Sequence, residues 1–259
     1  MKLEKINMAK KQEYLQAIYS RRDMFSNYFG QPFEKNDKYF ETNNTFVLAK
    51  PVRDFCRIYI ASNDKKDVAE ILSNLKGTNV INFPTKGDIQ GIEAIMTESG
   101  YERIGIYERF VYNVKDLIDG NVISKIEFAA ANDEEEIYNL YSGWKGFNLY
   151  TDWLPTHEEL KKFIENKSVI INKQNDKITG VNICPVMGAI MNLRLIIDLN
   201  GKGINLMNAM FDVARKTGIK RCQWWVSSQN TRAIDFYKRL GAILDGLRDY
   251  TYINTYIKR

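Results

Sequence analysis

The sequence predicts an α/β protein made of two similar halves, and three observations support this. The 259 residues are 44% hydrophobic and 27% charged, which is typical of a globular chain long enough for two small domains. The order strand–helix–strand–helix–strand can be read twice along the chain. The closing segments Ile92–Phe110 and Ala233–Thr251 align without a gap at an offset of 141 residues, so that Gly100 coincides with Gly241. We interpret this as an internal duplication.

In the first half, apolar spacing places the elements in turn. One or two helices are expected within 5–29. They are followed by expected strands at 45–50, 54–62, 78–83 and 103–114, and by expected helices at 65–77 and 87–101. The predicted domains are 1–115 and 125–259, joined by a linker at 116–124.

In the second half, helices are expected at 131–144 and 157–166, separated by an aromatic loop. Strands at 167–174 and 177–186 alternate around the turn Asn175–Asp176 and predict an antiparallel hairpin. A single strand is expected at 189–198, then a helix that Gly218 ends, and then a strand at 220–228, a helix at 230–242 and a final strand or hairpin at 247–257. The helix before Gly218 should bury one face, composed of Ile204, Met207, Met210, Phe211 and Ala214.

Composition argues against several classes of protein. The net charge of +5 is spread along the chain without a dense basic block, so nucleic-acid binding is not expected. No apolar run approaches the roughly 20 residues of a membrane span, and the charged first residues do not resemble a signal peptide. Three scattered cysteines favour a reducing cytoplasm over a disulfide framework. With His157 as the single histidine, no multi-histidine metal site can form, and His157 is expected on the surface at a helix start.

The stretch Asn200–Asn205 places two glycines around Lys202 at the N-terminus of a predicted helix. The first-turn N–H groups of a helix are unpaired, and the helix dipole favours an anion such as a phosphate there. Glycine allows a close backbone approach, and the lysine adds a positive charge. The alternative is a tight strand-to-helix turn without a ligand, and the turn alone does not decide between the two.

Two motifs of this half resemble the GNAT superfamily of N-acetyltransferases. The first is Asn200-Gly201-Lys202-Gly203-Ile204-Asn205, whose middle four residues match the family's R-G-K-G-I-G turn. The second runs from Asn230 to Gly241 and matches Asn-x-x-Ala-x-x-x-Tyr-x-x-x-Gly in full, with Tyr237 as its tyrosine. Asn200 replaces the usual Arg or Gln, and Asn205 replaces a small residue.

The resemblance implies two GNAT-like domains in tandem, each with a mixed, mostly antiparallel sheet flanked by helices. It also implies that acetyl-CoA, or another acyl-CoA, binds with its pyrophosphate on the turn amides, with Asn230 reaching toward the CoA arm. The N-terminal half is expected to be degenerate. Its counterpart of the turn, Ser62–Lys66, has no glycine and contains an acid, and Met96 stands where Tyr237 stands.

The reaction implied is transfer of an acyl group to a primary amine, which attacks the thioester directly in a ternary complex without a metal. Tyr237 would be the general acid for the departing thiolate, because a neutral phenol can donate a proton to it; its alternative role is core packing. Cys184 and Cys222 are expected to be buried structural thiols.

The general base and the acceptor are not identified by the sequence. A carboxylate of Asp152, Glu158 or Glu159 could serve as base, and so could a water held by Ser227 or Ser228. Aromatic residues suggest an acceptor pocket for an apolar, aromatic or cationic group on a small molecule or peptide, or else packing between the halves. These residues are Trp144, Phe147, Tyr150, Trp153, Tyr250, Tyr252 and Tyr256.

Two alternatives to an acyl-CoA-dependent enzyme stay open. The loss of Arg or Gln at Asn200 suits a longer-chain donor or the phosphopantetheine of a carrier protein, which lacks the CoA pyrophosphate. A non-catalytic regulatory protein that binds CoA or another ligand is the other alternative.

Overall fold

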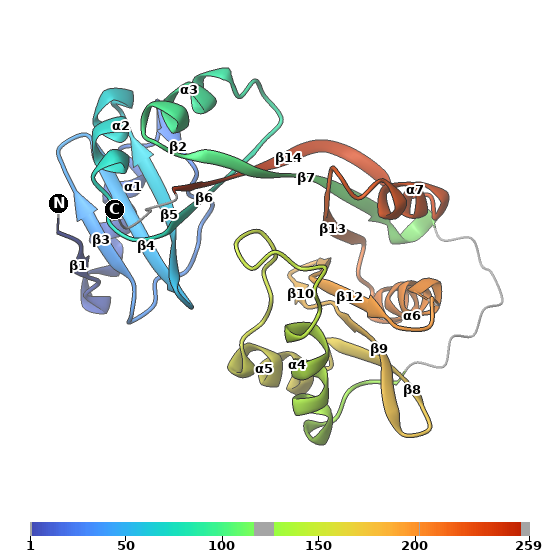
Figure 1. Cartoon of the computed structure of the whole chain (residues 1–259). Coiled ribbons are helices and arrows are strands. Elements are labelled where there is room, and N and C mark those ends of the chain that lie inside the picture. Colours follow the sequence, from blue (N-terminus) through green and yellow to red (C-terminus); the bar gives the residue numbers. More distant parts are fainter. Residues whose placement is uncertain (1, 117–126, 202, 255–259) are drawn as a thin grey trace. The chain divides into compact units, whose positions relative to one another are not determined.

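The computed structural model describes residues 2–116, 127–201 and 203–254 (Figure 1). The chain forms two compact units: unit 1 is Met1–Tyr107 with Leu247–Arg259, and unit 2 is Glu108–Gly246. Most of the predicted linker at 116–124 lies outside the described residues, and so do Lys202 and Tyr256. The predicted domain boundaries therefore stay predictions.

Unit 1 contains a mixed, mostly antiparallel sheet. Its elements are β1 (Glu4–Lys5), η1 (Met8–Lys10), α1 (Lys11–Tyr19), β2 (Phe25–Ser26), β3 (Lys38–Glu41), β4 (Thr45–Val52), β5 (Phe55–Ser62), α2 (Lys65–Ser73), β6 (Asn79–Thr85), α3 (Gln90–Glu98) and the start of β7 (Glu102–Asn113). The strand order is β1-β3-β4-β5-β6, and all these pairs are antiparallel except β5 with β6. The C-terminal strand β14 (Ile243–Asn254) pairs antiparallel with β6 through Arg248–Asn254.

Helices cover both faces of the sheet in unit 1. The apolar sides of α2 and α3 pack on one face, in a core that includes Leu72, Ile81 and Met96. On the other face α1 contributes Tyr14 and Ile18 to a second core. Of the one or two helices expected within 5–29, the structure has α1 preceded by the short η1.

Unit 2 contains two sheets. Its elements are η2 (Val114–Asp116), η3 (Ala131–Asp133), α4 (Glu134–Ser142), α5 (His157–Glu165), β8 (Val169–Gln174), β9 (Lys177–Ile183), β10 (Val186–Met187), β11 (Ile190–Leu193), β12 (Leu195–Asp198), α6 (Gly203–Lys216), β13 (Arg221–Ser227) and α7 (Thr231–Arg239). The predicted hairpin is confirmed as β8 and β9, with positive φ at Asn175 and Asp176. The fold class predicted from the sequence is confirmed as well, with helices flanking mixed, mostly antiparallel sheets.

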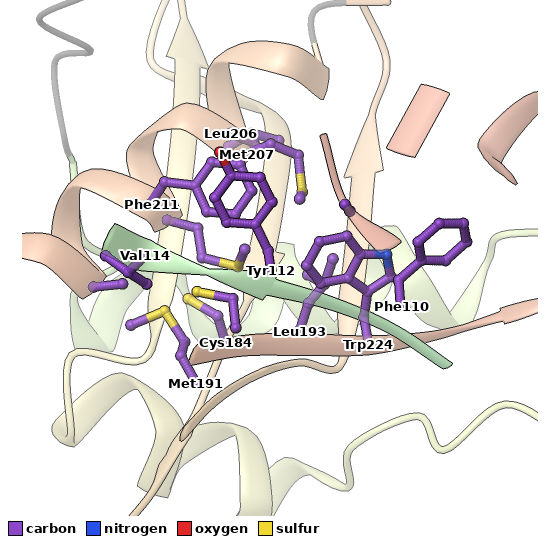
Figure 2. Close-up of a cluster of buried hydrophobic side chains, with 14 of the residues drawn as sticks. Phe110, Tyr112, Val114, Cys184, Met191, Leu193, Leu206, Met207, Phe211 and Trp224 are labelled. Carbon is purple, nitrogen blue, oxygen red and sulfur yellow. The ribbon is translucent and has the colours of Figure 1, made fainter. Parts of the chain in front are cut away.

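The core beneath α6 and α7 holds unit 2 together. Figure 2 shows Leu206, Met207 and Phe211 of α6 pointing toward Tyr112 and Trp224 of the strands. The rings of Tyr112 and Phe211 stack with centroids 4.7 Å apart. Of the helix face predicted to be buried, Ile204 is instead 37% exposed, because it lies in the first turn, where α6 projects beyond the core.

The alignment of the two closing segments is matched by their secondary structure. The helices α3 and α7 begin and end 141 residues apart, and so do the strands β7 and β14. Gly100 and Gly241 follow the two helices with φ of 79° and 84°, which a residue with a side chain adopts only at a cost. The predicted register of the repeat is therefore confirmed for these four elements.

Candidate active site in unit 2

The predicted strand at 189–198 is wrong in one respect, and the difference creates the candidate site. The chain divides at Arg194 into β11 and β12, which belong to different sheets. β11 runs parallel to β13 from Ile190↔Arg221 to Leu193↔Trp224, and the pairing ends there. β12 instead pairs antiparallel with β9, from Leu195↔Ile183 to Asp198↔Gly180.

This division leaves one edge of β12 without a neighbouring strand. In its three-stranded sheet the order is β12-β9-β8, so β12 is an edge strand among the described residues. The unpaired N–H and C=O groups of such an edge can bind an extended chain that carries amides. The glycine turn follows directly after this edge.

The turn places uncapped N–H groups at the start of α6. Gly201 has a φ of 68°, and no atom lies within 4 Å of the position that a side chain would occupy there. Within the described part of the chain, no side chain accepts a hydrogen bond from the N–H groups of Gly203, Ile204 or Asn205. The helices α2, α5 and α7 are each capped by the side chain that precedes them, whereas α1, α3 and α4 have no side-chain cap. The N-terminus of α6 is thus chemically suited to an anion.

An acidic side chain stands beside this turn, and sequence reasoning missed it. Asp198 Oδ1 accepts a hydrogen bond from the N–H of Asn200 at 2.9 Å. Its Oδ2 is buried and has no partner among the described residues, and a side-chain carbon built on Gly203 would lie 3.9 Å from it. The Asp198 carboxylate would oppose a bound anion through its charge.

Tyr237 lies on the buried face of α7. Its ring packs between Trp224 and Phe110, with centroid distances of 5.0 and 5.5 Å, and burial raises the pKa of its phenol to about 12. The hydroxyl makes no hydrogen bond to a described residue. The ring therefore packs in the core of unit 2.

Comparison with known proteins agrees with this geometry. Residues 134–242 match the model of the Acetyltransferase (GNAT) family. This stretch is a GNAT acetyltransferase domain. It contains the divided strand, the glycine turn and Tyr237. No curated protein matches the sequence at a significant level.

Solved structures share the fold over nearly the whole chain. A GNAT-family acetyltransferase from Colwellia psychrerythraea is similar with a TM-score of 0.62 and 13% identity, covering 98% of this chain and 99% of the other. A GCN5-related N-acetyltransferase from Sphaerobacter thermophilus has a TM-score of 0.63 and 11% identity, covering 97% and 94%. A glucosamine N-acetyltransferase region of a fungal β-N-acetylglucosaminidase has a TM-score of 0.63 and 12% identity, covering 97% and 38%. At these identities the likeness concerns the fold, which is consistent with two GNAT-like domains.

Asn230 is the cap of α7 in the GNAT domain. Its side-chain oxygen accepts a hydrogen bond from the N–H of Ala233 at 3.1 Å. Asn230 is exposed, so its amide nitrogen can still face a ligand. The cap and a contact to the CoA arm are therefore compatible.

Replacing Asn230 tests its role as the cap of α7. We expect Asn230→Ala to lower the free energy of unfolding by about 1 kcal/mol, because a helix donor loses its partner. Asn230→Ser keeps a capping oxygen and should keep the stability, as measured by chemical denaturation. Equal stability of the alanine variant and wild type would contradict the capping role.

The three carboxylates considered as general base in the GNAT domain already form hydrogen bonds or an ion pair. Glu159 forms a capping box with Thr156, and Glu158 pairs with Lys162 at 2.7 Å. Asp152 accepts a hydrogen bond from the N–H of Asn148 at 2.7 Å. Ser227 ends β13 and Ser228 follows it, and both are half-buried; Ser227 Oγ accepts a hydrogen bond from the N–H of Gln229 at 3.3 Å. The structure therefore leaves the general base unassigned.

The histidine and the cysteines occupy the positions that the sequence predicted. His157 begins α5, is 45% exposed, and pairs with Glu134 at 2.9 Å. Cys184 and Cys222 are buried, and burial raises the pKa of each thiol to about 12. Such thiols are poor nucleophiles. Within the described residues, no three acidic, histidine or cysteine side chains come together as metal ligands, and no helix combines the length and apolar character of a membrane span.

The predicted aromatic acceptor group does not form as one set. Trp144 and Trp153 are exposed in the loop after α4, at 40% and 46%. Tyr250 and Tyr252 are instead buried in the core of unit 1, because β14 pairs with β6 there. Their assignment to the acceptor pocket is therefore wrong.

In unit 1 the position that corresponds to the open edge of β12 is filled by the chain itself. β5 pairs in parallel with β6 only at Cys56↔Asn79 and Arg57↔Val80. Farther along, the same edge of β5 pairs with β2, through Phe25↔Ser62 and Ser26↔Ala61. A short extended segment thus occupies the place where β5 and β6 diverge.

The side chain of Asn27 completes this filling. Its oxygen accepts from the N–H of Ile60 at 2.6 Å, and its nitrogen donates to the carbonyl oxygens of Ile58 and Asn82 at 2.9 and 3.1 Å. Asn27 is 1% exposed. One amide group therefore bridges the two diverging strands. No sequence motif indicated this, because the contacts are 31 to 55 residues apart.

Removing the Asn27 amide should destabilise the protein. In Asn27→Ala three buried backbone groups lose their partner, and each unsatisfied group costs about 1 kcal/mol or more. We expect the free energy of unfolding to fall by about 2–3 kcal/mol in chemical denaturation. Asn7→Ala, which removes the exposed cap of η1, is the control and should cost less. A value for Asn27→Ala no larger than the control would show that the bridge is unimportant.

Proposed function

We propose that the chain is an N-acyltransferase that moves an acetyl or other acyl group from acyl-CoA to a primary amine. The observation that carries this proposal is the open edge of β12 leading directly into the uncapped glycine turn. The pantetheine arm of CoA is an extended chain with two amides, and in CoA it is joined to a diphosphate. An edge strand suits its amides, and a helix N-terminus suits its phosphates.

The unit 1 counterpart supports the same proposal. There, the divergence of two parallel strands is filled by backbone and by the amide of Asn27. The α2 N-terminus is also closed, because Asp64 accepts from the N–H of Lys66 and Asp67 lies in the first turn. We infer that unit 1 is a GNAT-like domain without a donor site, so that the chain has one active site.

In the proposed reaction the amine attacks the thioester carbon directly, and the thiolate leaves. The amides of Gly201 to Asn205 hold the diphosphate with Asn200 and Lys202 beside them, and Asn230 contacts the CoA arm. Tyr237 donates a hydrogen bond or proton to the departing sulfur. A water held by Ser227 or Ser228 takes the proton of the amine. No metal is needed for these steps.

The acceptor in this proposal is a small molecule or a peptide with a primary amine. We expect no role for nucleic acid or a membrane, and the three free cysteines support a reducing cytoplasm. The test is release of CoA from acetyl-CoA and from longer acyl-CoAs with a panel of amines. Acyl transfer to at least one amine is expected. No stabilisation by acetyl-CoA, together with no transfer, would refute the proposal.

Asp198 favours a second candidate, a donor carried by the phosphopantetheine of a carrier protein. Such a donor has fewer phosphate charges than CoA, and a carboxylate beside the turn penalises it less. Competition among CoA, dephospho-CoA and pantetheine separates the candidates. A preference for CoA supports the first, and equal binding of all three supports the carrier.

The charge of Asp198 can be removed without changing its shape. Asp198→Asn retains the oxygen that accepts from Asn200, and it should bind CoA several-fold more tightly because a like charge is gone. The affinity for uncharged pantetheine should change little. CoA affinity that falls in this variant would mean that the carboxylate helps to form the turn.

A further inference from the structure

The core of unit 2 contains a buried hydrogen-bond donor to which no described residue offers an acceptor. Trp224 is 1% exposed, and its Nε1 is buried without a hydrogen-bond partner. Buried polar groups in folded proteins nearly always have a partner, and leaving a buried donor unpaired costs about 1–3 kcal/mol. A phenylalanine would fill this core without that cost. An acceptor on a bound molecule would account for the N–H.

Trp224 lies where the two parallel strands separate. Leu193↔Trp224 is the last pair of β11 with β13, and after Leu193 the chain joins the other sheet as β12. In Figure 2 the nitrogen of Trp224 lies on the edge of the indole away from Met191, which precedes Leu193 on β11. The N–H is therefore on the side of the ring toward which the strands diverge. The proposed acyl donor enters between these diverging strands.

A second hydrogen-bonding group without a protein partner lies on the neighbouring ring. The ring of Tyr237 packs against that of Trp224 at an angle of 60°, with the centroids 5.0 Å apart. The Tyr237 hydroxyl, like the Trp224 N–H, makes no hydrogen bond to a described residue. Both rings lie in the same apolar core, so each polar group needs an acceptor or donor from elsewhere. Two such groups on contacting rings can bind adjacent atoms of one ligand.

We propose that the indole N–H of Trp224 donates a hydrogen bond to the thioester carbonyl oxygen of the bound acyl donor. This inference rests on the proposed function and adds a second catalytic residue to its site. In a thioester the sulfur and the carbonyl oxygen are bonded to the same carbon. Tyr237 therefore serves the sulfur, and Trp224 serves the oxygen beside it.

The N–H of Trp224 acts on the charge that develops during acyl transfer. When the amine nitrogen bonds to the carbonyl carbon, an electron pair of the C=O bond moves to the oxygen, and the N–H stabilises the negative charge there. As that pair re-forms the C=O bond, the C–S bond breaks and its electrons leave with the sulfur, to which Tyr237 donates. The proton released by the amine goes to the general base.

NMR of the wild-type chain tests the hydrogen bond directly. The sequence has four tryptophans, and with 15N-tryptophan each gives one indole N–H signal, of which Trp224→Phe identifies the one from Trp224. Acetyl-CoA should move this proton farther downfield than any other indole proton. S-ethyl-CoA, in which a CH₂ group replaces the carbonyl, should leave it near its position in the free protein. Equal shifts with both compounds, or no shift when acetyl-CoA is bound, overturn the inference.

Replacing the N–H measures what it contributes to the reaction. Trp224→Phe should lower kcat by about 10²-fold, as expected for the loss of one donor to a developing oxyanion, and should change the affinity for acetyl-CoA much less. Trp225→Phe is the matched control, because Trp225 is the next residue of β13 and is 39% exposed. It should retain kcat.

An isosteric replacement separates the N–H from the packing of the ring against Tyr237. Benzothienylalanine at position 224 keeps the two fused rings and has sulfur in place of the N–H. It should show the same loss of kcat as Trp224→Phe, and unchanged kcat overturns the inference. Acetyl-CoA binding and acyl transfer without a response of the Trp224 N–H leave the proposed function intact. Absence of transfer to every amine, together with absence of acetyl-CoA binding, refutes both.

Discussion

Tyr237→Phe is expected to lower kcat by about 10²–10⁴-fold, because the departing thiolate loses its hydrogen-bond or proton donor. The ring packs against Trp224 and Phe110, and phenylalanine preserves that packing, so stability should change little. Acetyl-CoA affinity should also be nearly unchanged. Single-turnover measurement of acyl transfer, with binding measured separately, distinguishes these effects.

Tyr101→Phe is the matched control for this variant. Tyr101 is a buried tyrosine of unit 1 whose hydroxyl has no partner among the described residues. Its removal should leave kcat unchanged. Unchanged turnover in Tyr237→Phe would instead support a non-catalytic protein, in which Tyr237 only fills the core.

Burial of Tyr237 also predicts how the protein responds to alkaline pH. Its pKa of about 12 lies above the reference value of about 10, so the phenol stays protonated in the folded protein up to pH 10 and beyond. The alkaline limit of activity below that pH must therefore come from another group. Because the unfolded chain loses this proton first, the stability contributed by Tyr237 is present below pH 10 and is lost as the pH rises toward 12.

Gly203→Ala is expected to lower acetyl-CoA affinity at least about 100-fold, because a methyl group prevents the phosphate from reaching the first-turn amides. Loss of two charge-assisted hydrogen bonds, worth about 1.5–3 kcal/mol each, accounts for that magnitude. In the free protein the nearest atom to this methyl group is Asp198 Oδ2 at 3.9 Å. The variant should therefore fold normally, and alanine should if anything favour the helix.

Gly91→Ala provides the control for Gly203→Ala. Gly91 lies in the first turn of α3, and a side-chain carbon there would meet only Lys65 Nζ at 3.8 Å. This variant should fold and bind acetyl-CoA as wild type does. If Gly203→Ala also binds as wild type does, the glycine turn serves only as a strand-to-helix connection.

Local patterns made much of this fold predictable. In the two aligned segments, 92–110 and 233–251, the helix is followed by a glycine with a positive φ, Gly100 or Gly241. The strand that follows each glycine has the same alternation of side chains, so the two segments share one register. The buried face of α6 follows its helical spacing, and Asn230 caps α7 because an asparagine oxygen suits a helix start.

Long-range contacts account for what the sequence did not reveal. The apolar run 189–198 has the period of one strand, and only its pairing with β13 and then with β9 divides it at Arg194. Asn27 and Asp198 are ordinary polar residues in the sequence. Asn27 bridges strands that lie 31 to 55 residues away from it, and Asp198 ends β12, whose separate pairing with β9 the sequence did not reveal. Tyr250 and Tyr252 likewise follow β14 into the core of unit 1.

Calorimetric titration of the full chain with acetyl-CoA tests the central claim most directly. If the open edge of β12 and the turn after it receive the donor, and the segment around Asn27 closes the corresponding place in unit 1, one molecule should bind per chain. Binding of two molecules per chain would contradict the closed state of unit 1. Absence of binding at millimolar acetyl-CoA would contradict a CoA site in unit 2.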